Sequence, residues 1–185
     1  MVMLDTSAAK IVDDAISEID EASTQGTDGK WLEYLTARAA PHLKDWDVDK
    51  AWLWGDWGER EDRFPNTTNQ DIGIDVVAKR RSDGELIAIQ CKSRRLDAEG
   101  RGSDITKREA DSFLSSSAGS IWAERWIVTN GDAKLSSNIE QTLSMSSKPL
   151  KLVNVRADLA SQRQITQIAE DCAHRQPDVD DESGK

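Results

Sequence analysis

Strict alternation of apolar and polar residues marks one short run of the chain more clearly than any other. Ile87, Ile89 and Cys91 occupy alternate positions of this run, which is the two-residue period of a β-strand. The two isoleucines require a buried core on their side of the strand. Gln90 and Lys92 therefore share the opposite face, and the pattern predicts that these two polar side chains are neighbours.

A second β-type run precedes this strand and ends at a turn signal. The turn is Ser82-Asp83-Gly84, so the two runs predict a hairpin over about residues 72–92. Asp75 lies between Ile74 and Val76 in the first run. A carboxylate in such an apolar setting costs free energy unless a cation or a hydrogen-bond donor compensates it. The hairpin therefore presents an acid, an amide and an ammonium group side by side.

The remaining apolar patterns predict helices and further strands on both sides of the hairpin. A stripe of Leu32, Leu35 and Ala39 predicts a helix that ends at Pro41. We expect helices over about residues 7–21, 28–40, 104–116 and 134–145 and from residue 161, and strands over about 48–54, 125–129 and 150–155. This order predicts an α/β sandwich around a mixed sheet.

Capping residues and composition shifts predict where helices begin and how the chain is divided. Asp104 is expected to cap the helix that follows it, and Ser161 with Gln164 fits a capping box at the start of the last helix. We expect an N-terminal helix and loop over residues 1–27, one main domain over 28–174, and an acidic, disordered tail over 175–185.

Composition is typical of a globular protein. Hydrophobic residues make up 37% and charged residues 31% of the 185 positions. No apolar run reaches the length that crosses a membrane. The N-terminus has neither a basic region nor a long apolar region, so we expect no secretory signal and a cytoplasmic protein.

The net charge of −10 argues at first sight against a nucleic-acid partner, but the charge is unevenly distributed. Residues 79–108 contain nine Lys or Arg and five Asp or Glu, so the hairpin and the following loop are the basic part of an acidic chain. Four cations there are candidates for phosphate contacts, with a merely solvated loop as the alternative: Lys79, Arg94, Arg95 and Arg101. Trp57, in a polar loop, is expected to be exposed and available for stacking on a base.

Two cysteines far apart and two histidines cannot build a typical zinc site, so a metal here would be held mainly by oxygen ligands, as Mg²⁺ and Mn²⁺ prefer. Asp75 is the first candidate ligand, and the side-chain carbonyl of Gln90 and the backbone carbonyl of Cys91 are uncharged candidates beside it. Lys92 is then placed to orient a water or to offset developing negative charge. This set suits metal-assisted phosphodiester hydrolysis.

At this point the sequence resembles a known family. Gly73-Ile74-Asp75 followed by Ile89-Gln90-Cys91-Lys92 resembles the PD-(D/E)XK nuclease superfamily, in its Mrr-like branch, where Gln replaces the usual acid before x-Lys. Residues 52–54, 127–130 and 158–160 resemble the N-terminal nuclease domain of type ISP restriction–modification enzymes and related restriction helicases. The resemblance covers about residues 28–170.

The resemblance implies a restriction-endonuclease-like αβα sandwich with a central mixed β-sheet. It implies a Mg²⁺-dependent DNA endonuclease of restriction or phage-defence type, in which Asp75, Gln90 and Lys92 match the family's metal and lysine positions. Glu33 matches an acid that the superfamily often supplies from the preceding helix, although an exposed helix charge is an equal alternative. Asp71 either adds to the acidic cluster or solvates its loop.

Helicase-translocase or methyltransferase subunits are expected as partners, and a homodimer or paired complexes would serve double-strand cleavage. A different class of function stays open: a catalytically inactive DNA-binding or assembly module on the same fold. An enzyme with a Ser or Cys nucleophile is disfavoured, because neither histidine lies in a recognisable base motif and Cys91 is expected to face the core.

Overall fold

The computed structural model describes residues 6–25, 29–65 and 72–174. Its helices are α1 (Thr6–Gln25), α2 (Lys30–Ala39), α3 (Arg60–Arg63), α4 (Lys107–Ser116), α5 (Ser137–Ser144) and α6 (Val155–His174). Its strands are β1 (Val48–Leu53), β2 (Val76–Arg80), β3 (Leu86–Lys92), β4 (Trp122–Thr129) and β5 (Leu150–Asn154). Short 3₁₀ turns lie at Ala40–His42, Lys44–Trp46 and Trp54–Asp56.

The five strands form one mixed sheet in the order β1-β2-β3-β4-β5. β1, β2 and β3 pair antiparallel, whereas β3, β4 and β5 pair parallel. A parallel pair needs a crossover, and the segments with α4 and α5 supply the two crossovers of this sheet. The predicted α/β sandwich around a mixed sheet is confirmed.

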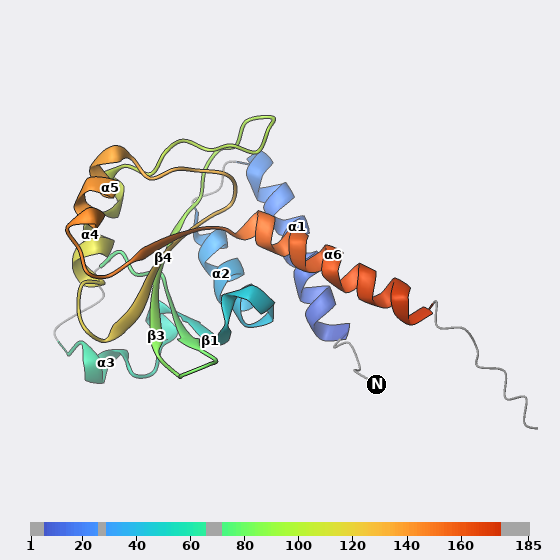
Figure 1. Cartoon of the computed structure of the whole chain (residues 1–185), viewed down its shortest axis with the longest axis horizontal. Coiled ribbons are helices and arrows are strands. Elements are labelled where there is room, and N and C mark those ends of the chain that lie inside the picture. The colour runs from blue at the N-terminus through green and yellow to red at the C-terminus, as the bar shows by residue number, and fades with distance from the viewer. Residues whose placement is uncertain (1–5, 26–28, 66–71, 175–185) are drawn as a thin grey trace, which may run out of the picture.

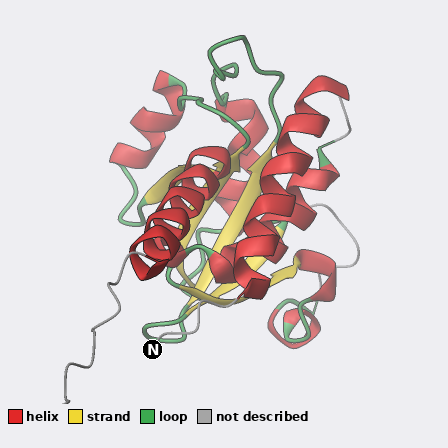
Figure 2. Cartoon of the chain, turned by 90° about the vertical axis from the view of Figure 1, so that its right-hand side faces the viewer, coloured by secondary structure: helices red, strands yellow, loops and turns green. Residues whose placement is uncertain are grey.

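Helices cover both faces of the sheet, so β3 is buried on both sides (Figures 1 and 2). α1, α2 and α6 cover one face, and Leu32, Leu35 and Leu159 join Ile87 and Ile89 there in a first core. α4 and α5 cover the other face, where Phe113 and Ile139 pack with Ala88, Ile127 and Trp122 in a second core. α1 also packs against α6 (Figure 1). The alternation in the sequence therefore distributes β3 between two cores.

Two predicted helix starts are wrong, and hydrogen bonds explain each difference. α4 begins after Thr106 rather than Asp104, because Thr106 and Glu109 form a reciprocal capping box. α6 begins at Val155, before Ser161, so the expected capping box at Ser161 lies inside the helix. The side chain of Asn154 accepts a hydrogen bond from the Ala157 N–H at 3.2 Å, which caps the helix directly after β5.

The loop after β1 folds back over the second core and buries its tryptophan. Trp57 is 3% exposed, so the expectation of an exposed ring available for base stacking is wrong. Its ring centroid lies 5.9 Å from that of Trp54 and 5.8 Å from that of Trp122. Phe64 closes the cluster at 6.3 Å. These aromatic contacts provide the burial that the polar sequence around Trp57 does not indicate.

Some expectations fall on residues that the structure does not describe. Asp71 and the acidic tail, residues 175–185, lie outside the described ranges. Among the described helices, none combines the length and the apolar character that a membrane span requires.

Candidate active site

The backbone turns at Asp75, just before β2 begins. Its N–H donates to the carbonyl of Ile89 at 2.9 Å, whereas its carbonyl accepts from the N–H of Trp54 at 2.8 Å. In a regular strand both groups of one residue face the same neighbouring strand. At Asp75 they face opposite neighbours, so the chain is twisted there as at a bulge. Because of this twist, the Asp75 side chain does not follow the alternation of side chains between the two faces of the sheet.

The Asp75 carboxylate is held against β3 by a charge-assisted hydrogen bond. The backbone N–H of Cys91 donates to Oδ2 of Asp75 at 2.7 Å. Cys91 stands between Gln90 and Lys92 in β3. The acid from one strand is therefore tied to the middle residue of the Gln-x-Lys segment on the next strand.

Gly73 allows the chain just before Asp75 to pass close to α4. Its φ is +78°, and an added Cβ would lie 2.7 Å from the backbone nitrogen of Phe113 in α4. Only glycine satisfies both the positive φ and the close contact. Sequence reasoning did not assign this role to Gly73, although a glycine two residues before an acid with apolar neighbours was the available signal.

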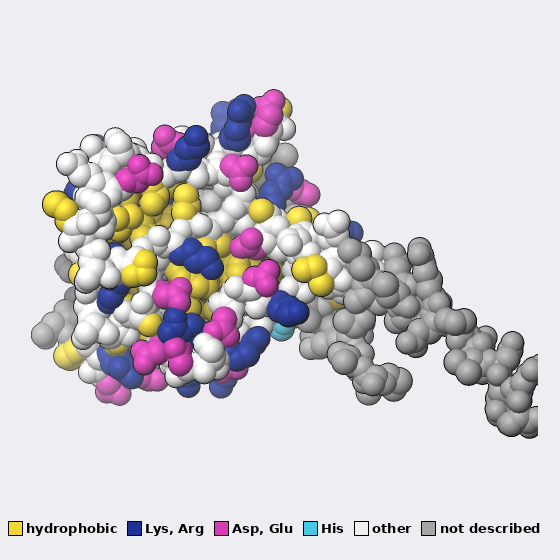
Figure 3. Space-filling model, in the orientation of Figure 1, with side chains coloured by type: hydrophobic (Ala, Val, Ile, Leu, Met, Phe, Trp, Pro, Cys, Tyr) yellow, Lys and Arg dark blue, Asp and Glu magenta, His cyan; other side chains and the backbone are white. Residues whose placement is uncertain are grey.

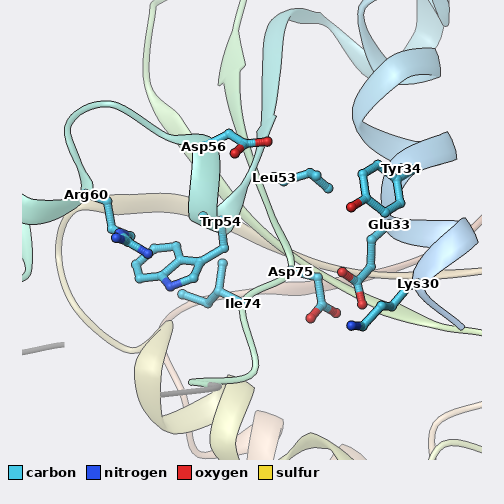
Figure 4. A pocket seen from close by; sticks show the side chains of 10 residues that line it. Lys30, Glu33, Tyr34, Leu53, Trp54, Asp56, Arg60, Ile74 and Asp75 are labelled. Atoms are coloured by element: carbon cyan, nitrogen blue, oxygen red, sulfur yellow. The ribbon is translucent and has the colours of Figure 1, made fainter. Parts of the chain in front are cut away.

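A cavity of about 510 Å³ opens at the end of the sheet where Asp75 lies. Its lining comes from α2, from the end of β1 with the following turn and α3, and from the segment before β2: Lys30, Glu33, Tyr34, Leu53, Trp54, Gly55, Asp56, Arg60, Ile74 and Asp75. Figure 4 shows the carboxylates of Glu33 and Asp75 and the ammonium group of Lys30 pointing toward one another. The structure therefore brings Glu33 and Asp75 together in one cavity.

Gln90 and Lys92 belong to the same corner of the fold but are not among the residues that line this cavity. Gln90 is 3% exposed, and its buried Oε1 atom has no hydrogen-bond partner among the residues that the structure describes. Lys92 is half-buried at the end of β3. A buried carbonyl oxygen without a donor costs free energy, and a bound cation or water would remove that cost.

The chain beyond Lys92 is fixed by one buried amide. Asn130, fully buried at the end of β4, accepts from the Arg94 N–H at 2.7 Å and donates to the Arg94 carbonyl at 2.9 Å. Arg94 itself is bound to the protein, because its guanidinium pairs with Glu109 at 2.8 Å and its side chain is 11% exposed. The structure gives Arg94 a role in anchoring the loop.

The donor set fits a hard divalent cation. In the described part of the chain, no group of three or more His, Cys, Asp or Glu side chains is arranged to hold a metal. A metal at this corner would have to rely on carboxylates such as Asp75 and Glu33 together with uncharged oxygens. The side-chain oxygen of Gln90 is an uncharged oxygen without a hydrogen-bond partner among the described residues, and carboxylate and amide oxygens are what Mg²⁺ and Mn²⁺ prefer.

Comparison with known proteins gives the family. Residues 38–173 match a family model of the Mrr catalytic type described as a restriction endonuclease. The chain belongs to this Mrr-like restriction endonuclease family. No curated protein and no solved structure gives a significant match. The matched segment of this Mrr-like endonuclease contains Asp75, Gln90 and Lys92 but begins after Glu33, and the narrower resemblance to type ISP enzymes stays a prediction.

The other basic residues proposed for phosphate contacts in the Mrr-like endonuclease lie in different parts of the fold. Lys79 is exposed but lies four residues along from Asp75, toward the hairpin turn and the opposite end of the sheet. Arg95 is exposed just beyond β3, at the end where Asp75 lies. Arg101 is exposed and pairs with Asp97 and Glu99, both at 2.9 Å. On the face shown in Figure 3, cationic and anionic side chains are interspersed.

The Cys91 thiol of the Mrr-like endonuclease is not suited to nucleophilic chemistry. Burial raises its pKa well above the ordinary value, and the nearby Asp75 charge raises it further. The thiol donates to the hydroxyl of Thr36 at 3.5 Å and packs against the first core. The expectation that Cys91 faces the core is confirmed, and its side chain stays protonated at neutral pH.

Proposed function

We propose that this Mrr-like endonuclease hydrolyses phosphodiester bonds of DNA with the help of a divalent cation, Mg²⁺ with Mn²⁺ as a substitute. The observation that carries the proposal is the hydrogen bond from the Cys91 N–H to the Asp75 carboxylate. It fixes a carboxylate against the Gln-x-Lys segment, next to a second carboxylate in a cavity. Family membership supports the reaction class.

Each side chain has a distinct role in this proposal. Asp75 and Glu33 supply the negative charge that holds the cation, and the side-chain carbonyl of Gln90 is a neutral ligand. The bound cation supplies Lewis-acid polarisation of the phosphate and lowers the pKa of a coordinated water. Lys92, one strand repeat beyond Gln90, orients the attacking water or stabilises the negative charge that develops on the phosphate.

The backbone of Cys91 supports the same arrangement. A strand residue directs its N–H and its carbonyl to the same neighbouring strand. Because the Cys91 N–H bonds to Asp75, the Cys91 carbonyl is expected to face that side as well. This carbonyl is proposed as a further neutral ligand, in agreement with the hard-oxygen character of the set. Asp71 is proposed as a further contributor of negative charge.

The biological role that we propose is restriction of foreign DNA. Arg95 and Arg101 are exposed near the loop after β3 and are proposed to contact phosphates, with Lys79 as a more distant contact. Cleavage of both strands requires two active sites, so a homodimer or paired complexes are proposed. Helicase-translocase or methyltransferase partners are proposed from the resemblance to type ISP enzymes.

The test is cleavage of supercoiled and linear DNA by purified wild-type protein and by Lys92→Met. We expect cleavage with Mg²⁺ or Mn²⁺, none with EDTA, and a loss of about 10²-fold or more in Lys92→Met. Lys50→Met is the matched control, since Lys50 is an exposed lysine of β1. Equal cleavage in EDTA would refute the metal mechanism. DNA binding without any cleavage, unchanged in Lys92→Met, would favour the inactive-module alternative.

A further inference from the structure

The cavity at Asp75 has an apolar aromatic wall that the hydrolysis itself does not use. Tyr34 of α2 is 61% exposed, although it is one of the cavity-lining residues. Trp54, at the end of β1, is half-buried and lines the cavity from another element. Figure 4 shows Trp54 and Tyr34 on different sides of the Glu33–Asp75 pair. A phosphodiester and a cation need neither ring.

Trp54 is held rigidly by its own neighbours. Its ring lies 5.4 Å from Phe64 in an edge-on arrangement and 5.9 Å from the buried ring of Trp57. Such backing fixes the indole before any ligand arrives, which reduces the entropy cost of binding against it. Trp54 therefore forms a preorganised apolar surface at the active site.

Cationic groups complete the cavity. Lys30 and Arg60 line it together with the two carboxylates and the aromatic residues. The Arg60 side chain is 17% exposed and contacts Glu61 at 3.5 Å. The volume of the cavity, about 510 Å³, lies within the range of small-molecule sites. Aromatic faces suit a base, cations suit phosphates, and the acids suit the metal.

We propose that this cavity holds one unstacked nucleoside of the DNA strand that is cut, with its base against Trp54 and Tyr34 at the rim. The inference rests on the proposed function, because it places the nucleoside next to the scissile phosphate. The substrate class is therefore a nucleotide outside the helical stack, either in a single strand or extruded from a duplex. Stacking of a base on an aromatic side chain is tolerant of sequence, so this subsite selects strand geometry rather than base identity.

The first experiment measures binding without cleavage. Fluorescence anisotropy with a labelled single-stranded oligonucleotide in Ca²⁺ compares wild type with Trp54→Ala, Trp54→Phe and Tyr34→Ala. We expect about tenfold weaker binding in each alanine variant and near-wild-type binding in Trp54→Phe. Trp52→Phe is the control, since Trp52 packs against the second core and does not line the cavity. Unchanged affinity in both alanine variants would overturn the inference.

A second measurement uses the unmodified sequence and does not depend on a variant that folds. Tyr34 is the single tyrosine of the chain, so nitration of wild-type protein reports on this position alone. Single-stranded oligonucleotide should protect Tyr34 from nitration in a concentration-dependent manner. Nitration at the same rate with saturating oligonucleotide would contradict the proposal.

The two sources of an unstacked nucleotide are separated by comparing the affinities for a single strand, a matched duplex and a duplex with a mismatch next to the cleavage position. Tighter binding of the mismatched than of the matched duplex assigns extrusion, because the mismatch lowers the cost of unpairing, whereas a preference for the single strand over both duplexes assigns a single-strand substrate. Equal binding of the two duplexes, both tighter than the single strand, would overturn the inference. If Lys92→Met abolishes metal-dependent cleavage while Trp54→Ala and Tyr34→Ala bind normally, the subsite is wrong and the proposed function stands.

Discussion

The carboxylate of Asp75 accepts a hydrogen bond of 2.7 Å from the backbone N–H of Cys91. The bond replaces a backbone partner where the chain before β2 departs from regular pairing with β3. The bond joins the segment before β2 to the end of β3 at one point. The acid of the proposed site is thus also part of the sheet, and its charge and its hydrogen-bonding capacity can be separated by mutation.

Asp75→Asn and Asp75→Ala are expected to differ in stability but not in activity. Asparagine retains an oxygen that can accept from Cys91, whereas alanine leaves that N–H without a partner, at a cost of about 1–3 kcal/mol. Chemical denaturation should show this difference, and both variants should lose cleavage. An Asp75→Asn variant that cleaves like wild type would remove the carboxylate from the mechanism.

Gly73→Ala is expected to destabilise the protein more than Gly100→Ala or Gly58→Ala. Gly73 has both a positive φ and a close contact with α4, Gly100 has a positive φ of +79° with open space, and Gly58 has neither. The unfolding free energy should therefore fall most in Gly73→Ala, by about 1–3 kcal/mol or more. The unfolding free energy should fall less in Gly100→Ala and least in Gly58→Ala. If Gly58→Ala instead lowered it most, the packing described at Phe113 would be contradicted.

Asn130→Ala is expected to loosen the loop after β3 and to slow cleavage. The substitution leaves the N–H and the carbonyl of Arg94 without their buried partners, so stability should fall by about 2–3 kcal/mol. Hydrogen exchange of the loop should accelerate, because Asn130 no longer fixes it. Asn138→Ala, at an exposed position of α5, is the control and should change neither quantity.

Gln90→Met is expected to weaken cleavage without lowering stability. Methionine removes the buried Oε1, which has no hydrogen-bond partner in the described part of the chain, so in metal-free buffer the variant should be as stable as wild type or about 1 kcal/mol more stable. Cleavage should require more Mg²⁺, since one neutral ligand is lost. A marked loss of stability in EDTA would show that Gln90 serves packing or bonding rather than the metal.

The Cys91 thiol is expected to resist alkylation across the neutral range. Its pKa is raised by burial and then by Asp75, so the thiolate forms only above the pH at which an ordinary cysteine ionises. In a Cys172→Ser background at about pH 8, the native protein should react with iodoacetamide far more slowly than the denatured protein. Cys91→Ser should retain metal-dependent cleavage. Rapid native alkylation would contradict the buried position of the thiol.

The hairpin and the identity of its polar residues could be predicted because alternation is a local property. β3 shows the pattern directly, and Asp75 stands out as a charge among apolar neighbours. The cavity could not be predicted in this way, because Lys30, Trp54 and Arg60 come from elements that only the tertiary fold brings beside Asp75. The burial of Trp57 likewise depends on aromatic partners from a distant strand.

Helix starts show the same limit. Asp104 and Ser161 are good caps by residue type, yet Thr106 and Asn154 provide the hydrogen bonds that are made. Glu33 illustrates the reverse case. Its sequence position allowed both a site member and a surface charge, and the fold places its carboxylate next to that of Asp75 (Figure 4).

The most direct test of the central claim is a calorimetric titration of the protein with Mn²⁺ in the absence of DNA. We expect saturable binding by wild type, loss of that binding in Asp75→Asn, and retained binding in Lys92→Met, which nevertheless does not cleave. Identical Mn²⁺ binding by wild type and Asp75→Asn would contradict a cation site at Asp75.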